Sequence, residues 1–282
     1  MTSESAPRLP PELEHEVFQM AAALHPTTLT ALLRVAKRVY AWLEPELYRQ
    51  LVVEYITNDD GAPQNARYTA FFTAASIKPE LFRSGPHTVA LAEIPGDPVQ
   101  LFGTLLCCSQ LRLAVGGGIL TQDVKDIISQ FQLHRLATQV ELLFDAADAT
   151  AYASRFLYLT HLEVFEGFES LSQPFVLALP ALTHLAFTVG PQEPSNDVDK
   201  FLERIPRLRV CVLIWGLVER GADLLDPMPQ LGQRVHDPRV VVASYHTWWE
   251  AVSEIDNFWE RAEGLIDRKR RKEVAADYLW AK

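Results

Sequence analysis

The chain has 282 residues, of which 48% are apolar and 22% charged, a balance that supports a sizeable buried core and excludes global disorder. Its net charge of −10 argues against nucleic acid as the main partner. The absence of an apolar run long enough to span a bilayer argues against a membrane segment, and the first residues do not have the layout of a signal peptide. Cys107, Cys108 and Cys211 form no Cys-x-x-Cys pair, so we expect buried thiols and a cytoplasmic location.

Residues 9–53 are predicted to form two or three short helices. Pro10 and Pro11 suit the first turn of a helix that ends at His25, because the residue before a proline is pushed out of the helical region. A second helix is predicted from Thr27 or Thr28 as far as Leu43. The apolar stripe of the first helix is Leu13, Val17, Met20 or Ala21, and Leu24, and the expected buried face of the second is Leu29, Leu32, Leu33, Ala36, Val39, Tyr40 and Leu43.

A linker with one helix is predicted over residues 54–85, and a recurring pattern follows it. Asn58 to Pro63 has the composition of a loop, and Ala70 to Phe82 reads as a helix. Three segments (159–167, 182–190 and 208–216) then share the pattern Leu-x-x-apolar-x-apolar-x-x-Gly. Weaker copies are residues 86–94, 110–118, 137–145 and 237–245.

Each copy of the pattern predicts a half-buried strand, because its apolar residues alternate with a period of two. Helical segments are predicted between the copies, at Pro98–Cys107, Gln122–Gln132, Ser172–Leu179 and Asp197–Ile205. A strand and a helix that recur every 22 to 29 residues fall in the range of leucine-rich repeats, which bury their apolar faces by stacking. The alternative is a non-repetitive α/β domain with several strands.

The residues that alternate with the core positions are expected on the outer face of these strands. This face comprises Arg112 and Ala114; Gln139, Glu141 and Leu143; His161, Glu163 and Phe165; His184, Ala186 and Thr188; and Val210, Val212 and Ile214. Because the last three are all apolar, we expect another part of the chain to cover them. We predict that the C-terminal helix does so through Trp248, Trp249 or Trp259.

Residues 246–282 predict this helix, with an apolar stripe and a basic run at its end. The run from Arg268 to Lys272 has the composition of a nuclear localisation signal, but cations are also favoured at the end of a helix by its dipole. The sequence therefore leaves the nucleus open as a second location.

The sequence shows no signature of catalysis. It lacks Gly-x-Ser-x-Gly and His-Glu-x-x-His, and Gly116-Gly117-Gly118 lacks the Lys-Ser/Thr that follows a phosphate-binding loop. His161 and His184 hold the same place in their copies and are expected to be neighbours, with Glu163 near, which is a conceivable metal site. Exposed histidines on a repeat surface are commoner, so we predict no metal, no cofactor and no enzyme, with an unrecognised hydrolase as the remote alternative.

The N-terminal stretch resembles an F-box, and most closely the F-box-like proteins of mushroom-type fungi. The motif is carried by Leu9-Pro10 with Glu12 and Leu13, by Val17-Phe18, by Leu29, Leu32 and Leu33, by Val35 with Lys37-Arg38, and by Pro45-Glu46-Leu47-Tyr48. The family usually has a tryptophan four residues after the valine, where this chain has Val39, and Trp42 follows three residues later. The C-terminal Phe258-Trp259 with Arg261-Ala262-Glu263 also resembles the end of these proteins.

This resemblance implies a substrate-recognition subunit of an SCF-type ubiquitin ligase, with a Skp-type adaptor and a cullin complex as partners and an unknown protein as substrate. It assigns adaptor contact or its support to Leu9, Pro10, Leu13, Val17, Phe18, Leu33 and Val35. The substrate face would comprise Arg112, Glu141, His161, Glu163, Phe165 and His184. The alternative is a stand-alone protein-binding scaffold whose head is only an N-terminal cap.

The predicted fold is therefore of the α/β class. It comprises a small F-box-like helical head (1–53), a linker and helix (54–85), an irregular leucine-rich-repeat-like arc of strands and helices (86–245), and a C-terminal capping helix (246–282).

Overall fold

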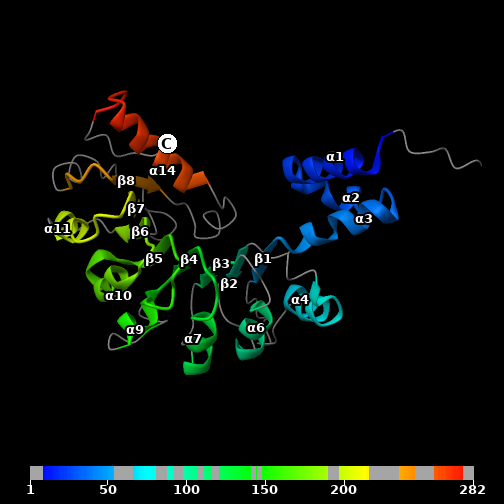
Figure 1. The fold of residues 1–282 in the computed structure, drawn as a ribbon, viewed down its shortest axis with the longest axis horizontal. Helices are drawn as coiled ribbons and strands as arrows, with labels where there is room; N and C mark the ends of the chain where they lie inside the picture. Colours follow the sequence, from blue (N-terminus) through cyan, green and yellow to red (C-terminus); the bar gives the residue numbers. More distant parts are fainter. Residues whose placement is uncertain are drawn as a thin grey trace, which may run out of the picture.

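The computed structural model describes residues 9–53, 66–80, 88–91, 98–106, 111–115, 121–140, 144, 148–189, 197–215, 235–244 and 257–275. It is a mixed α/β structure with a cluster of helices at its N-terminal end and a parallel sheet (Figure 1). In this described part, no helix combines the length and the apolar character that crossing a membrane requires.

The sheet has eight strands, all parallel, which lie side by side in chain order. Parallel neighbours need a crossover connection, and helices lie between most of the successive strands. The strands are β1 (Gln50–Val53), β2 (Thr88–Leu91), β3 (Arg112–Val115), β4 (Arg135–Thr138), β5 (His161–Gly167), β6 (His184–Val189), β7 (Val210–Trp215) and β8 (Val240–Ser244).

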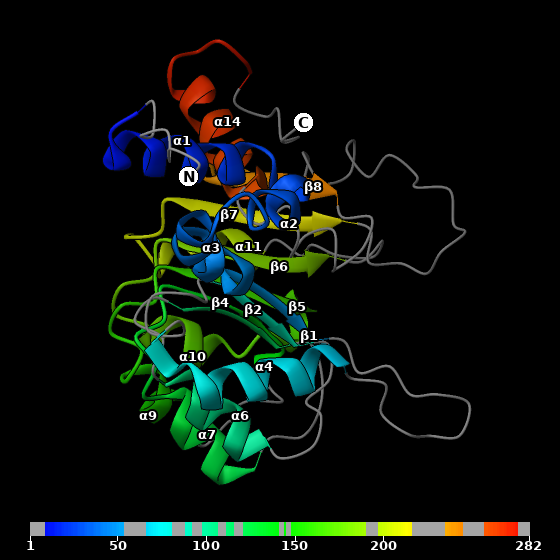
Figure 2. The same cartoon turned by 90° about the vertical axis from the view of Figure 1, so that its right-hand side faces the viewer.

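The connecting helices pack on one face of this sheet, as Figures 1 and 2 show. They are α4 (Ala66–Ile77), α6 (Pro98–Leu105), α7 (Gln122–Ile128), α9 (Ala149–Ala153), α10 (Gln173–Ala178) and α11 (Asp197–Glu203), with the short turn η3 (Phe168–Ser170) after β5. The sequence predicted four of these helices near their observed positions. The helix expected over 70–82 is instead α4, which begins at Ala66 and ends at Ile77, and α9 was missed.

The main core lies between the sheet and these helices. Alternate strand residues such as Leu162 and Val164 of β5 point into it and are fully buried, together with Phe175 and Val176 of α10. The leucine that opens each strong copy of the pattern, for example Leu159, is buried in the same core. The predicted alternation is therefore confirmed for β5, β6 and β7.

One predicted strand was placed four residues too late. In the copy at 159–167 the strand starts at the third residue, His161, so the copy at 137–145 predicted a strand that starts at Gln139. The observed strand β4 starts at Arg135, which pairs with Arg112 on one side and His161 on the other. The pattern was hard to recognise because Thr138, which is 1% exposed, occupies a core position where the other strands have an apolar side chain. Gln139 therefore follows the strand, and Glu141 and Leu143 lie outside the described residues.

Two arginines, each in the segment that follows a helix, donate hydrogen bonds to the end of the described helix before that one. Arg207 donates to the carbonyls of Leu177 and Leu179 at the end of α10. Arg155, which follows α9, donates instead to two side-chain oxygens at the end of α7, Asp126 Oδ1 at 3.3 Å and Ser129 Oγ at 3.1 Å. The last carbonyls of a helix have no partner within it, and at the end of α10 Arg207 satisfies two of them.

The helix α14 (Asn257–Arg270) packs on the opposite face of the sheet, above β7 and β8 (Figure 2). Its residues Trp259, Ala262, Leu265 and Ile266 form a second apolar cluster with strand residues of that face. The strand residues are Ala186, Val210, Val212, Ile214, Val241 and Ala243. The prediction that the C-terminal helix covers Val210, Val212 and Ile214 through a tryptophan is thus confirmed for Trp259. Trp248 and Trp249 lie outside the described residues.

The N-terminal helices lie at the β1 end of the sheet (Figure 1) and have a small core of their own. They are α1 (Pro11–Leu24), η1 (Pro26–Thr28), α2 (Leu29–Leu32), α3 (Lys37–Leu43) and η2 (Glu44–Tyr48). The second helix predicted here is broken in two, because Ala36 adopts an extended conformation before α3 begins. Tyr40, expected to be buried, is exposed and its hydroxyl donates to Glu44 at 2.8 Å.

Candidate protein-docking surfaces

The head, residues 9–48, carries an exposed apolar stripe along α1. At about 100° per residue, Leu13, Val17, Met20 and Leu24 fall within a narrow arc of the helix surface. These four side chains are 48% to 67% exposed, and Leu9 just before the helix is 47% exposed. The predicted stripe is therefore real, and it does not face the small core of the head. We call Leu9 and these four residues the α1 stripe.

The opposite side of α1 builds the core of the head. Ala22 is buried with Val39 and Leu43 of α3, and Phe18 packs against this group. The ring of His15 lies 5.1 Å from that of Trp42. Because α1 packs against α3 through these residues, the α1 stripe on its other side is exposed to solvent.

The remaining residues that the resemblance assigned to the adaptor fall into two groups. Pro10 and Val35 are exposed, Val35 in the turn between α2 and α3. Phe18 and Leu33 are half-buried and pack against the small core of the head. The geometry therefore makes Leu9, Pro10, Leu13, Val17 and Val35 available for contact, whereas Phe18 and Leu33 support the helices.

Ion pairs hold the helices of the head in place. Arg38 of α3 donates to both carboxylate oxygens of Glu14, at 3.1 and 2.7 Å. Glu44 accepts from Tyr40 and from Lys78, which follows α4, so the head is tied to the helix layer of the sheet. The hydrogen bond from Lys78 lowers the pKa of Glu44, against the opposing effect of burial.

A row of basic and imidazole side chains crosses the other face of the sheet. The register aligns Arg112 of β3, Arg135 of β4, His161 of β5 and His184 of β6. All four project from the face that α14 covers at its β7–β8 end, since their neighbours in each strand enter the main core. Arg135 was missed from the sequence because the β4 pattern was read out of place; the Leu133-His134-Arg135-Leu136 spacing could have revealed it.

His161 and His184 stack on each other, as their equal place in the repeating pattern predicted. Their ring centroids are 4.0 Å apart and the planes are 9° from parallel. Each Nδ1 lies 2.8 Å from the hydroxyl of the preceding threonine, Thr160 or Thr183. Trp259 of α14 stands edge-on to both rings, with centroids 5.3 and 5.5 Å away.

The environment of this histidine pair favours the neutral rings. Burial lowers the pKa of His161 to about 3, helped by His184, Arg135 and Arg112. Burial also lowers the pKa of His184, although Glu263 of α14, whose Oε1 lies 2.9 Å from His184 Nε2, opposes that shift. Neutral imidazoles are therefore part of the contact between the sheet and α14.

The other expected substrate-face residues are not equally accessible. Glu163 and His184 are buried, while Arg112, His161 and Phe165 are half-buried. Glu141 lies outside the described residues. Any partner that approaches this face would therefore meet Arg112, His161 and Phe165 before the other two.

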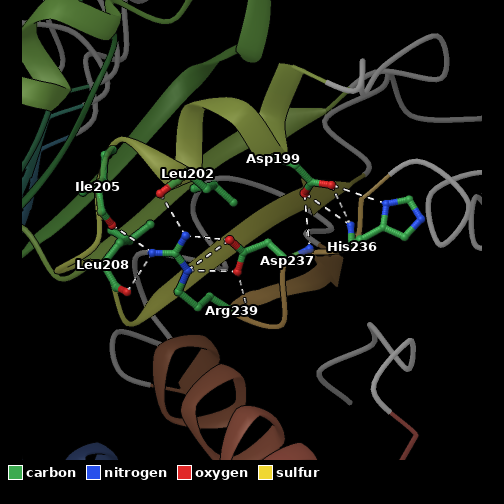
Figure 3. Close-up of polar contacts among 7 residues, drawn as sticks. All are labelled: Asp199, Leu202, Ile205, Leu208, His236, Asp237 and Arg239. Carbon is green, nitrogen blue, oxygen red and sulfur yellow. Dashed lines mark hydrogen bonds and ion pairs between the residues drawn. The ribbon is translucent and has the colours of Figure 1, made fainter.

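A dense polar network fixes β8 against α11 (Figure 3). The guanidinium of Arg239 donates to the carbonyls of Leu202, Ile205 and Leu208 at 2.9, 2.8 and 3.3 Å, and to the carboxylate of Asp237. Burial would raise the pKa of Asp237, but the hydrogen bonds from Arg239 outweigh it and lower that pKa. This network positions the last strand, so we assign it a structural role.

The network is completed by Asp199 of α11. Its carboxylate accepts from the backbone amides of His236 and Asp237, at 3.0 to 3.2 Å (Figure 3). The segment that leads into β8 is therefore held by charge-assisted bonds at both of its ends.

Within the described ranges, no group of three or more His, Cys, Asp or Glu side chains is arranged to hold a metal ion, and the histidine pair is engaged by Thr160, Thr183 and Glu263. The α1 stripe is apolar, and the row on the sheet combines two arginines with two neutral imidazoles. Comparison of the chain with protein-family models and with curated proteins found no match.

Proposed function

We propose that the protein is a substrate-recognition subunit of an SCF-type ubiquitin ligase. In this proposal the head is an F-box-like module that binds a Skp-type adaptor, and the sheet with its helices is an irregular leucine-rich-repeat-like array that holds a protein substrate. The proposal rests on the F-box-like residue pattern between Leu9 and Tyr48 together with one structural observation, which is the exposure of the α1 stripe.

The α1 stripe carries the argument because large exposed apolar side chains are concentrated in the head. Of thirteen such side chains among the described residues, eight belong to the head. A contiguous apolar surface on a soluble protein marks an interaction site more often than chance exposure does. A row at i, i+4, i+7 and i+11 also fits the way that a helix presents anchors to a protein groove.

The array reading is supported by the recurrence of one structural unit. Each strand pairs in parallel with the next along the chain, and the helices between them cover one face. Units of this kind bury their apolar faces only by stacking, and they leave a broad face for a partner. The head and this face lie on different parts of the chain, which suits a subunit that joins two proteins.

The test is co-purification of the full chain with a recombinant Skp-type adaptor. We expect direct binding, and we expect Val17→Asp to weaken it at least tenfold, because a charge would replace an apolar anchor worth about 1–3 kcal/mol. Leu9→Ala with Pro10→Ala should weaken binding in the same direction. Circular dichroism should show the helices retained, since Val17 is outside the core of the head.

The matched control is Val99→Asp, which places the same charge at an exposed valine of α6, outside the head. This variant should bind the adaptor as the unmodified chain does. Failure of the intact chain to bind would rule out the ligase proposal and favour a stand-alone binding scaffold. Equal loss in both variants would show that the α1 stripe is not the contact.

A further inference from the structure

The contact between His184 and Glu263 shows which kind of group this part of the sheet accepts. Glu263 of α14 places its Oε1 2.9 Å from Nε2 of His184. An ionised carboxylate can only accept a hydrogen bond, so Nε2 of His184 carries a proton and donates it. Because the pKa of His184 is lowered, the ring is neutral at neutral pH, and its Nδ1 therefore accepts from the hydroxyl of Thr183 at 2.8 Å.

His161 repeats this arrangement on the neighbouring strand. Its Nδ1 lies 2.8 Å from the hydroxyl of Thr160, and its ring is stacked on that of His184 with the planes 9° from parallel. The carbonyl of His134, beside Thr160, already accepts from two backbone amides, so the Thr160 hydroxyl is available to donate to Nδ1. Nε2 of His161 is then a donor like that of His184, and no residue of the described ranges accepts from it.

Two arginines extend this line of donors across the sheet. The register aligns Arg135 of β4 and Arg112 of β3 with His161, and neighbouring strands are about 4.8 Å apart. All three side chains are half-buried and can be reached from solvent, whereas Ala137 and Glu163 in the next row of the same face are buried. Since α14 lies above β7 and β8 (Figure 2), it leaves these three side chains to a partner. We call them the donor row.

The electrostatic potential at the donor row is suited to an anion. The two arginines are charged at every physiological pH. Burial is the main cause of the lowered pKa of His161, and the positive charges of Arg135 and Arg112 add to it. The same charges that disfavour a proton on this ring attract a carboxylate. A positive row on a chain whose net charge is −10 is therefore a local feature that can select an acidic partner.

We propose that the donor row binds an acidic segment of a partner protein, in the way that Glu263 of α14 binds His184. Aspartate or glutamate side chains of the segment would accept from Arg112, Arg135 and His161. Arginine holds a carboxylate with two parallel bonds, and such charge-assisted bonds are stronger than neutral ones. The inference rests on the proposed function only in identifying this partner as the protein to be ubiquitinated.

The test is fluorescence anisotropy of the full chain with a labelled peptide in which glutamate alternates with serine. A peptide with glutamine in place of glutamate is the neutral probe. We expect the acidic peptide to bind and the neutral one not to bind, and we expect added salt to weaken the binding because it screens exposed charges. Binding of both peptides alike, or of neither, would overturn the proposal. A phosphoserine peptide that binds where the acidic peptide does not would assign the row to phosphate and overturn it as well.

Three variants locate the contact. Arg112→Gln with Arg135→Gln removes both charges and should weaken binding of the acidic peptide at least about tenfold. His161→Phe keeps an aromatic ring beside His184 but has no N–H donor, so it should weaken binding roughly threefold. The control is Arg204→Gln, which removes the same charge from an exposed arginine directly after α11, in the helix layer. This variant should bind as the unmodified chain does, and an equal loss in it would show attraction to charge in general and would overturn the proposal.

Nuclear magnetic resonance of the unmodified chain gives a readout that needs no arginine variant. The ring signals of His161, assigned by their loss in His161→Phe, should show the proton on Nε2, and the acidic peptide should shift them. The signals of His25, an exposed histidine of the head, should stay in place. A proton on Nδ1 instead, or His161 signals that do not move when the peptide is bound, would contradict the proposal.

The peptide experiments are independent of the adaptor. Co-purification with the Skp-type adaptor reports on the α1 stripe, whereas the peptide reports on the donor row. Loss of peptide binding with adaptor binding intact would overturn this inference alone, and the reverse result would overturn the ligase proposal alone.

Discussion

At the scale of single residues, Arg239 shows how one side chain can fix the last strand of the sheet. Its guanidinium donates to the carbonyls of Leu202 in α11 and of Ile205 and Leu208 after it, and to the carboxylate of Asp237 (Figure 3). The side chains of Arg239 and Asp237 are only 19% and 12% exposed. Removal of one partner from such a pair leaves the other charge buried without compensation, which is costlier than loss of a surface ion pair.

Arg239→Met should therefore lower the free energy of unfolding by about 3 kcal/mol, measured by urea denaturation followed by circular dichroism. Arg155→Met is the control, because Arg155 and its partner Asp126 are about half exposed, at 53% and 47%. It should cost less than about 1 kcal/mol. Similar losses for both variants would show that the Arg239 network contributes no more than a surface pair.

At the scale of elements, α14 is the one described helix that packs on the second face of the sheet. It closes an apolar surface that β7 and β8 would otherwise present to water. Lys269 adds a polar contact, because its Nζ donates to the carbonyl of Val240 at 3.0 Å. The basic run from Arg268 to Lys272 is thus partly engaged: Arg270 pairs with Asp267 and Arg271 with Glu273.

Trp259 is the aromatic residue that α14 buries in this contact, and it is 3% exposed. Trp259→Ala should lower the free energy of unfolding by about 3 kcal/mol, because a large buried ring is replaced by a cavity. The melting temperature of the purified variant is the measurement. Leu157→Ala, at a side chain 58% exposed, should change stability by less than about 0.5 kcal/mol. An unchanged melting temperature for Trp259→Ala would mean that α14 contributes little to the fold.

At the scale of the whole molecule, the head and the sheet have separate apolar cores. Val39 and Leu43 belong to the core of the head, while the main core extends from Val89 of β2 to Val242 of β8. Among the described residues the two parts are connected by the pairing of β1 with β2, by the packing of Tyr48 and by the Glu44–Lys78 ion pair. Separate cores predict local unfolding of one part without the other.

Leu43→Ala should destabilise the head by about 2–4 kcal/mol, because Leu43 is fully buried there. Hydrogen exchange should accelerate in α1 and α3 and stay unchanged in β5 to β7. Leu13→Ala is the control in the same part of the chain, since its exposed side chain contributes little to the core of the head. Acceleration throughout the sheet in Leu43→Ala would indicate one cooperative unit instead of two.

The sequence correctly predicted the strands whose apolar residues recur with a regular period. Leu159 and Leu162, repeated as Leu182 and Leu185, placed β5 and β6 correctly and made the neighbours His161 and His184 predictable. The β4 pattern failed where a buried threonine replaced an apolar residue. A β-branched threonine fits the same space as valine, but its hydroxyl removes it from any pattern based on hydrophobicity.

Other features lie beyond what a pattern can show. Periodicity located the α1 stripe but could not decide whether it faces the core or water, because that depends on which side of α1 meets α3. The Arg239 network was not predicted, because its acceptors are mostly backbone carbonyls. Every residue has a backbone carbonyl, so the residue types do not indicate which carbonyls will accept. Tyr40 fits an apolar stripe by spacing, and its ring lies at the surface with its hydroxyl on Glu44.

Two arginines bond to carbonyls of a helix that precedes them in the chain, and this has a consequence for synthesis on the ribosome. The carbonyls of Leu202 and Leu177 are bonded by Arg239 and Arg207, which lie 37 and 30 residues later in the chain. At roughly 5–20 residues per second, each helix emerges a few seconds before the side chain that completes it. The ends of α10 and α11 therefore gain these hydrogen bonds only after a later part of the chain has been synthesised.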